Sequence, residues 1–147
     1  MKRMILTTLS VLAVLISTPL AAQQYEGFGS YEAHYSAINT SLLSPQVARA
    51  YDIQRSGNRA MLNIAVLRTE EGEQDEPVSA RVSAELVNLT GQRRTIELQE
   101  IRDQGAIYYI GTFRITNEEN VNFRISVQPD GYPRAHEFTF RQQFYVL

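Results

Sequence analysis

The sequence predicts an all-β protein, an immunoglobulin-like β-sandwich of about seven antiparallel strands with one short helix near residues 45–52. Three observations support this prediction. After Asn58, apolar and polar residues alternate with a period of two, which is typical of strands that bury one face. Short stretches rich in Gly, Asn, Asp and Pro separate the alternating segments. Only one stretch of the chain carries helix signals.

Alternation and turn residues together give the order of the elements. The sequence predicts strands over residues 30–38, 60–67, 78–86, 95–99, 107–115, 121–127 and 137–141. Turn residues such as Asp103-Gln104-Gly105 and Pro129-Asp130-Gly131 lie between them. Short strands at such close intervals are typical of a sandwich. The Cys…Trp…Cys core of antibody domains is absent from the sequence, so we expect similarity of architecture only.

The helix signal lies just before the long run of strands. Ser44 is a favoured N-cap and Pro45 suits the first helical position. Val47 and Tyr51 are four residues apart and therefore share a helix face, and Gly57 ends any helical segment. We expect about two turns of helix lying over an open end of the sandwich.

The first 22 residues have the order of an export signal. Lys2 and Arg3 form a positive region, an apolar run follows over residues 4–16, and Ala21-Ala22 offers small residues for cleavage. The apolar run is short for a membrane-spanning helix, which needs about 20 residues. We therefore expect a signal peptide over residues 1–22, cleavage after Ala22, a single domain over residues 23–147, and membrane contact only before cleavage.

Composition excludes several classes of function. The sequence contains no cysteine, which rules out disulfides, zinc–thiolate sites and thiol catalysis. Residues 23–147 carry 12 arginines, no lysine and 16 acidic side chains, a formal charge of 12 − 16 = −4. They show no basic stripe, so a nucleic-acid partner is not expected. The acidic run over residues 69–77 lacks the ligand order of a calcium loop, and we interpret it as a solvated hairpin loop.

Two histidines are the only neutral-pH acid–base groups. His34 falls on the outward face of its predicted strand, whereas His136 is in register with Phe138 and Phe140 toward the core. Two metal ligands must converge on one ion, so strand alternation argues against a metal site shared by both histidines. Neither histidine belongs to a nucleophile motif. We assign no catalytic, cofactor-binding or metal-binding residue and expect no cofactor.

The stretch "YEAHYSAINTSLLSPQVARAYDIQRSGNRAMLNIAV", followed by "GAIYYIGTFRIT", resembles a family of uncharacterised exported proteins of Gram-negative bacteria, catalogued only as a domain of unknown function. The resemblance extends over the whole of residues 23–147. It implies a small β domain exported to the periplasm and brings no catalytic residue with it. The family's recurring residues match His34, Tyr35, Asn39, Pro45, Ala48, Tyr51 and Arg55 here.

Two interpretations of this stretch remain open. As a lid, its apolar side chains would plug an end of the sandwich, through Tyr35, Leu43, Val47 and Tyr51, while Asn39 and Arg55 satisfy backbone groups. As a binding surface, a groove would be lined by His34, Asn39, Tyr51 and Arg55, because aromatic and arginine side chains are enriched at binding hot spots.

The functional hypothesis is a non-catalytic periplasmic binding or envelope-assembly module. Its partner would be another envelope protein or a peptide, held at an exposed strand edge or at the surface of residues 31–58. The alternative is a small periplasmic enzyme or metal carrier that uses His34 or His136.

Overall fold

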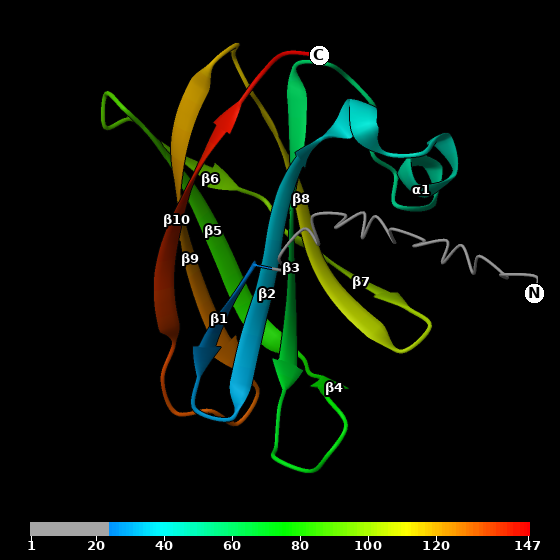
Figure 1. The fold of residues 1–147 in the computed structure, drawn as a ribbon, viewed down its shortest axis with the longest axis vertical. Coiled ribbons are helices and arrows are strands. Elements are labelled where there is room, and N and C mark those ends of the chain that lie inside the picture. Colours follow the sequence, from blue (N-terminus) through cyan, green and yellow to red (C-terminus); the bar gives the residue numbers. More distant parts are fainter. Residues whose placement is uncertain (1–23) are drawn as a thin grey trace, which may run out of the picture.

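The computed structural model describes residues 24–147, so the signal peptide expected at residues 1–22 lies outside the described residues. The described chain forms ten strands, one 3-10 turn and one α-helix (Figure 1). They are β1 (Gln24–Phe28), β2 (Tyr31–Asn39), η1 (Thr40–Leu42), α1 (Pro45–Ala50), β3 (Arg59–Arg68), β4 (Glu76–Pro77), β5 (Ala80–Asn88), β6 (Arg93–Ile96), β7 (Gln99–Asp103), β8 (Ala106–Arg114), β9 (Glu119–Pro129) and β10 (His136–Phe144). Within residues 24–147, no helix is both long enough and apolar enough to cross a membrane.

The strands form two antiparallel sheets, which confirms the predicted all-β sandwich. Sheet A has the order β1-β2-β3-β8-β7, with β4 paired to β3, and sheet B has the order β10-β9-β5-β6. The expected count of about seven strands is too low, because β1 and the two-residue β4 were not predicted. The segment predicted as one strand over residues 95–99 is also divided between β6 and β7.

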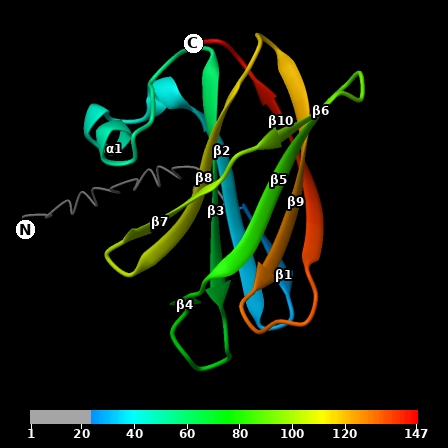
Figure 2. The same cartoon turned by 180° about the vertical axis from the view of Figure 1, so that it is seen from behind.

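The chain changes sheets between β6 and β7. β6 pairs with β5 in sheet B and β7 pairs with β8 in sheet A, so Glu97 and Leu98 carry the chain across one side of the sandwich (Figure 2). Gly111 on β8 makes this crossing possible. A β-carbon at Gly111 would lie 2.4 Å from the carbonyl oxygen of Glu97 and 2.6 Å from the Ile96 side chain. A residue without a side chain is therefore required where the crossing passes β8.

The inner faces of the two sheets form the main core. Phe123 on β9 is fully buried and stacks on Phe140 with ring centroids 4.4 Å apart. Phe113 and Phe144 meet Phe123 edge-on, at centroid distances of 5.5 and 6.1 Å. Other fully buried members of the core are Leu62, Ile64, Val66, Leu86, Val121, Ile125 and Val127. These are the inward positions that the period-two pattern predicts for the buried face.

The helix packs on the outer face of sheet A. The prediction that it would lie over an open end of the sandwich is therefore wrong. Ser44 caps it as predicted, accepting a hydrogen bond from the Val47 backbone N–H at 3.2 Å. The buried helix residue is Ala48, which joins Met61 and Ile110 in a second apolar cluster, whereas Val47 is 40% exposed. The helix lies there because β3 and β8 present apolar side chains on both faces, and the outer ones need cover.

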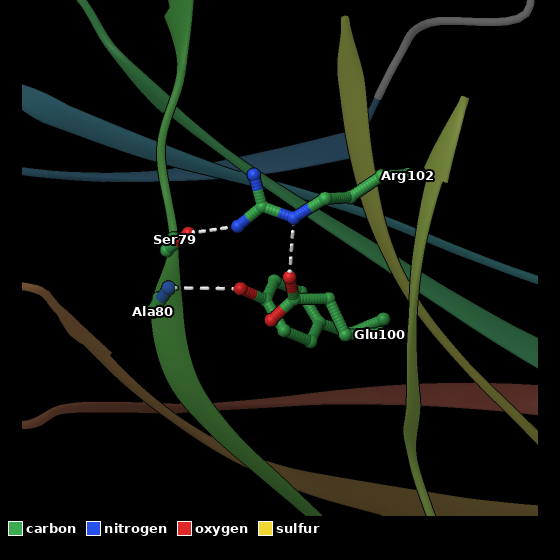
Figure 3. A network of polar contacts seen from close by, with 5 residues as sticks. Ser79, Ala80, Glu100 and Arg102 are labelled. Carbon is green, nitrogen blue, oxygen red and sulfur yellow. Dashed lines mark hydrogen bonds and ion pairs between the residues drawn. The ribbon is translucent and has the colours of Figure 1, made fainter. Parts of the chain in front are cut away.

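A polar network joins the two sheets at the start of β5 (Figure 3). The backbone N–H of Ala80 donates to the hydroxyl of buried Tyr109 on β8 at 2.8 Å. Arg102 on β7 donates to Ser79 at 2.6 Å and to Glu100 at 2.8 Å. Burial raises the pKa of the Tyr109 hydroxyl, the hydrogen bond from Ala80 lowers it, and the charge of Glu100 raises it further. The net pKa shift is upward.

Tyr109→Phe is expected to lower the free energy of unfolding by about 1 kcal/mol at neutral pH, because the Ala80 N–H loses its acceptor. The folded-state pKa of Tyr109 lies above the unfolded value. Its contribution is therefore complete below about pH 10 and is lost as the pH rises through the folded pKa. Urea unfolding at neutral and strongly alkaline pH should show the difference between parent and variant shrinking at the higher pH.

The control for this prediction is Tyr25→Phe, since Tyr25 is 55% exposed. We expect no change in stability for that variant at neutral pH. An equal loss in both variants, or a difference that does not depend on pH, would show that the Tyr109 hydroxyl has no such role.

Candidate functional site

The outer face of sheet A has an open groove beside the region that the helix covers. Its volume is about 560 Å³, and we call it the outer-face groove. Outward side chains of β2, β3 and β8 form most of it, and residues around β4 close one end. The lining residues used below are His34, Ser36, Asn63, Ala65, Leu67, Asp75, Pro77 and Tyr108. The floor is apolar because β3 carries apolar residues on its outer as well as its inner face.

Strand pairing fixes the positions of the polar side chains in the outer-face groove. Ser36 on β2 lies opposite Asn63 on β3, and His34 lies opposite Ala65. The oxygen Oδ1 of Asn63 is buried and has no hydrogen-bond partner among the described residues. A buried acceptor without a donor costs about 1–3 kcal/mol, so Asn63 reduces the stability of this part of sheet A.

His34 lies at the β1 side of the outer-face groove. Its Nε2 is 2.8 Å from Glu32 Oε2, and its ring stacks on Tyr25 with centroids 5.4 Å apart. The His34 and Glu32 side chains are 23% and 27% exposed, so solvent still reaches the pair. The imidazole therefore forms part of the groove wall and is held in place from two sides.

His136 lies on the other side of sheet A, facing the interior. Its Nε2 is 3.0 Å from Glu26 Oε1, and its ring stacks on Phe28 at 4.5 Å with an interplanar angle of 3°. Tyr25 and Glu26 are neighbours on β1 and point to opposite faces of the strand, so the two histidines hold β1 from opposite sides. Their imidazoles do not converge. Across residues 24–147, no cluster of three or more His, Asp or Glu side chains has the arrangement of a metal site.

Asn39 is buried, with 7% of its surface exposed, and does not line a surface groove. Its Nδ2 donates to the carbonyl oxygen of Tyr145 at 2.7 Å and to that of Gly57 at 3.4 Å. The Leu147 backbone N–H donates to the same Gly57 carbonyl at 3.1 Å. Asn39 therefore joins the end of β2, the loop before β3 and the last residues of the chain.

Asn39→Ala is expected to lower the free energy of unfolding by about 1–2 kcal/mol, because the carbonyls of Tyr145 and Gly57 lose a shared donor. Asn117→Ala provides the matched control, since Asn117 is exposed and accepts from the Val146 N–H in the same terminal segment. The control should change stability by less than about 0.5 kcal/mol. Chemical denaturation of both variants checks this prediction, and equal losses would contradict it.

Tyr51 and Arg55 belong to the helix segment. The Tyr51 hydroxyl donates to Asp103 Oδ2 at 3.0 Å, and its half-buried ring packs on the second apolar cluster. Burial and the Asp103 carboxylate raise the pKa of Tyr51. Arg55 is exposed and donates to the Ser41 carbonyl at 3.0 Å. The Tyr51 contact links the end of the helix to sheet A, and the Arg55 contact links the residues after the helix to the turn that precedes it.

The four candidate residues do not meet at one place. His34 lines the outer-face groove and Asn39 lies in the interior. Tyr51 and Arg55 line two adjacent shallow hollows that share Asp52 and Ile53. The remaining groove residues, above all Asn63, Ala65 and Tyr108, were not among the candidates. The outward positions of the segments 60–67 and 107–115 carried the signal, because they hold apolar residues where a solvated strand face would be polar.

The described residues thus define an antiparallel β-sandwich with an open groove on the outer face of one sheet. The chain belongs to the family Domain of unknown function (DUF4426), which matches residues 25–146 and confirms the resemblance to a family of unknown function. The crystal structure of a DUF4426 family protein, PA0388 from Pseudomonas aeruginosa PAO1, is 32% identical, with a TM-score of 0.72 over 85% of this chain and 96% of that chain. No curated protein sequence matches this chain.

The same fold occurs in more distant structures. FetP of a uropathogenic E. coli strain, recombinantly expressed in the periplasm of E. coli, has a TM-score of 0.59 at 9% identity, over 85% of this chain and 95% of that chain. A copper-bound variant of that FetP has a TM-score of 0.60 at 12% identity, over 86% of this chain and 97% of that chain. At these identities the likeness concerns the fold alone.

Proposed function

We propose that this protein is a non-catalytic binding module of the periplasm that holds a segment of another envelope protein in the outer-face groove. The observation that carries the proposal is the groove itself, about 560 Å³ in volume, with an apolar floor. Contiguous exposed apolar surface rimmed by polar residues often marks an interaction site.

The construction of the groove supports binding better than chemistry. Its wall and floor come mainly from β2 and β3, which pair along the whole of β2, and from the part of β8 that has separated from β3 and is paired with β7 instead. The groove is open to solvent, so an extended segment can enter it from the surface more easily than an enclosed cavity would allow. Tyr108 and Leu67 supply apolar contact area, while Ser36 and Asn63 offer hydrogen-bonding groups at defined positions.

A small periplasmic enzyme or metal carrier using His34 or His136 is the second candidate, and the copper-bound FetP variant is the reason to keep it. Copper sites in proteins combine several imidazole, thiolate or thioether ligands on one ion. Here each imidazole pairs with a single glutamate, and the two lie on opposite sides of sheet A. Copper titration of the parent, His34→Ala and His136→Ala tests this candidate. The candidate requires that the parent binds copper stoichiometrically and that one of the two variants does not.

Site-specific photo-cross-linking in living cells tests the binding proposal. A benzophenone amino acid replaces Ser36 in the outer-face groove or, as a matched control, Ser83, an exposed serine lining the hollow on sheet B. We expect one discrete adduct from position 36, identified by mass spectrometry as an envelope protein, and none from position 83. Ala65→Phe, which fills the groove floor, should abolish the adduct without lowering the melting temperature.

Two results would overturn the binding proposal. One is the absence of any adduct at position 36 in cells that express the protein at its native level. The other is an adduct pattern that is the same from positions 36 and 83, or an adduct that persists in the Ala65→Phe variant. In either case the cross-linking would not depend on the groove.

Export is tested separately. The intact mass of the protein recovered from a periplasmic extract should correspond to a chain that begins at Gln23. Full-length protein in the cytoplasmic fraction would contradict the proposed location.

A further inference from the structure

The charges around the outer-face groove are mainly negative. Asp75 lines the groove, and no ion-pair partner for it lies within 4 Å among residues 24–147. The loop between β3 and β4 ends at Asp75 and also carries Glu70, Glu71 and Glu73, all exposed. This loop projects from one end of sheet A (Figure 1). The nearby Arg68 is already paired with Glu76, so it does not neutralise the loop.

The lining itself adds no strong positive charge. It contains no arginine and no lysine, and its one basic group, the His34 imidazole, is held by Glu32. The groove therefore presents apolar surface and an acidic end, which together complement a segment with apolar side chains and positive charge.

Strand geometry sets the spacing of these features. Asn63 and Arg68 are five residues apart on β3, which corresponds to about 17 Å at 3.4 Å per residue. Arg68 pairs in register with Glu76, the residue after Asp75, so the acidic end lies roughly one five-residue strand length from Asn63. An extended segment of four or five residues spans this distance.

We infer that the occupant of the outer-face groove is an extended basic segment of a partner protein, with an apolar side chain on the floor formed by Ala65 and Leu67 and a lysine or arginine at the Asp75 end. The inference rests on the proposed binding function and specifies the chemistry of the partner. Charge complementarity with the acidic loop selects the segment and increases its rate of association.

Two synthetic peptides of equal length test the inference, acetyl-Lys-Leu-Lys-Leu-amide and acetyl-Glu-Leu-Glu-Leu-amide. Each is titrated at low salt into the ¹⁵N-labelled protein purified from the periplasm of an expression host, and amide shifts are followed by NMR. We expect the lysine peptide to shift the amides of residues 63–67 and 75–77, with a dissociation constant in the millimolar range. The glutamate peptide should bind at least about fivefold more weakly.

Two substitutions localise the charge effect. Asp75→Lys should weaken binding of the lysine peptide by about fivefold, whereas Glu137→Lys, the same charge change at an exposed position on β10, should change it less than twofold.

The inference is wrong if both peptides bind equally, if neither shifts the groove amides, or if Glu137→Lys weakens binding as much as Asp75→Lys. These outcomes are distinct from failure of the proposed function. An envelope partner that cross-links at position 36 equally well in the Asp75→Lys variant would preserve the binding function and overturn only the basic character of the segment.

Discussion

Replacing Phe123 with alanine is expected to lower the free energy of unfolding by about 3–5 kcal/mol, a large fraction of the stability of a domain of this size. Phe123 is fully buried between the sheets and contacts three other phenylalanine rings, with Phe140 stacked on it at 4.4 Å. The strands around it are held by long ladders of hydrogen bonds, so the cavity cannot collapse fully. Urea denaturation followed by far-ultraviolet circular dichroism measures the effect.

Phe123→Leu serves as the comparison for this prediction. It retains much of the apolar volume and loses mainly the ring contacts, so we expect a smaller loss, about 1–2 kcal/mol. A loss below about 1 kcal/mol for Phe123→Ala would mean that the sheets close around the gap and that the rings do not form the centre of the core.

The second large effect is expected at the change of sheets. Gly111→Ala should lower the free energy of unfolding by about 3 kcal/mol, because the new β-carbon would meet the Glu97 carbonyl oxygen at 2.4 Å. The neighbour in this contact is backbone, so relief requires movement of the strand crossing itself. The melting temperature is the simplest measurement.

Gly27→Ala is the control for Gly111→Ala, since a β-carbon at Gly27 has nothing within 4 Å. It lies in strand β1 and should be neutral or slightly stabilising, because alanine reduces the conformational freedom of the unfolded chain. If both alanine variants melt together with the parent, the crossing over Gly111 is less tight than the structure indicates.

The sequence predicts the interior of the fold well because alternation reports directly on burial. In the segments 60–67 and 121–127, the inward residues such as Leu62 and Phe123 are the most buried in the domain. The helix cap is equally local, since Ser44 and the Val47 N–H are three residues apart. These features depend on one strand or one turn at a time and need no knowledge of which strands are neighbours.

The features that were not predicted depend on contacts between distant segments. Residues 95–99 alternate regularly, yet the chain leaves one sheet and joins the other at Glu97. This change of sheet is evident only from the pairing of β6 with β5 and of β7 with β8. β1 was not predicted because it has few apolar residues and contains Gly27. An edge strand of this kind is held by its partner and not by its own propensity.

The candidate site shows the same limit. His34 was selected from its outward position on β2, and it does line the outer-face groove. Asn39 was selected through its match to the resembling family, just after the predicted strand, but it faces inward, toward the carbonyl of Tyr145. The position of Asn63 beside Ser36 follows from the register of β2 with β3, and sequence alternation does not specify the register between two strands.

The contacts that close the sandwich around β10 have a consequence for the order in which the chain folds. Gln142 donates to Ala37 across 105 residues of chain, Asn39 to Tyr145 across 106, and His136 meets Glu26 across 110. Domains dominated by such non-local contacts fold in milliseconds to seconds, because the entropy of closing long loops is lost before the contacts form. β1, β2 and β3 pair with one another early in the chain, but their contacts with the opposite sheet are complete only when the final strand β10 is present, so a ribosome that still holds the last dozen residues leaves the sandwich open.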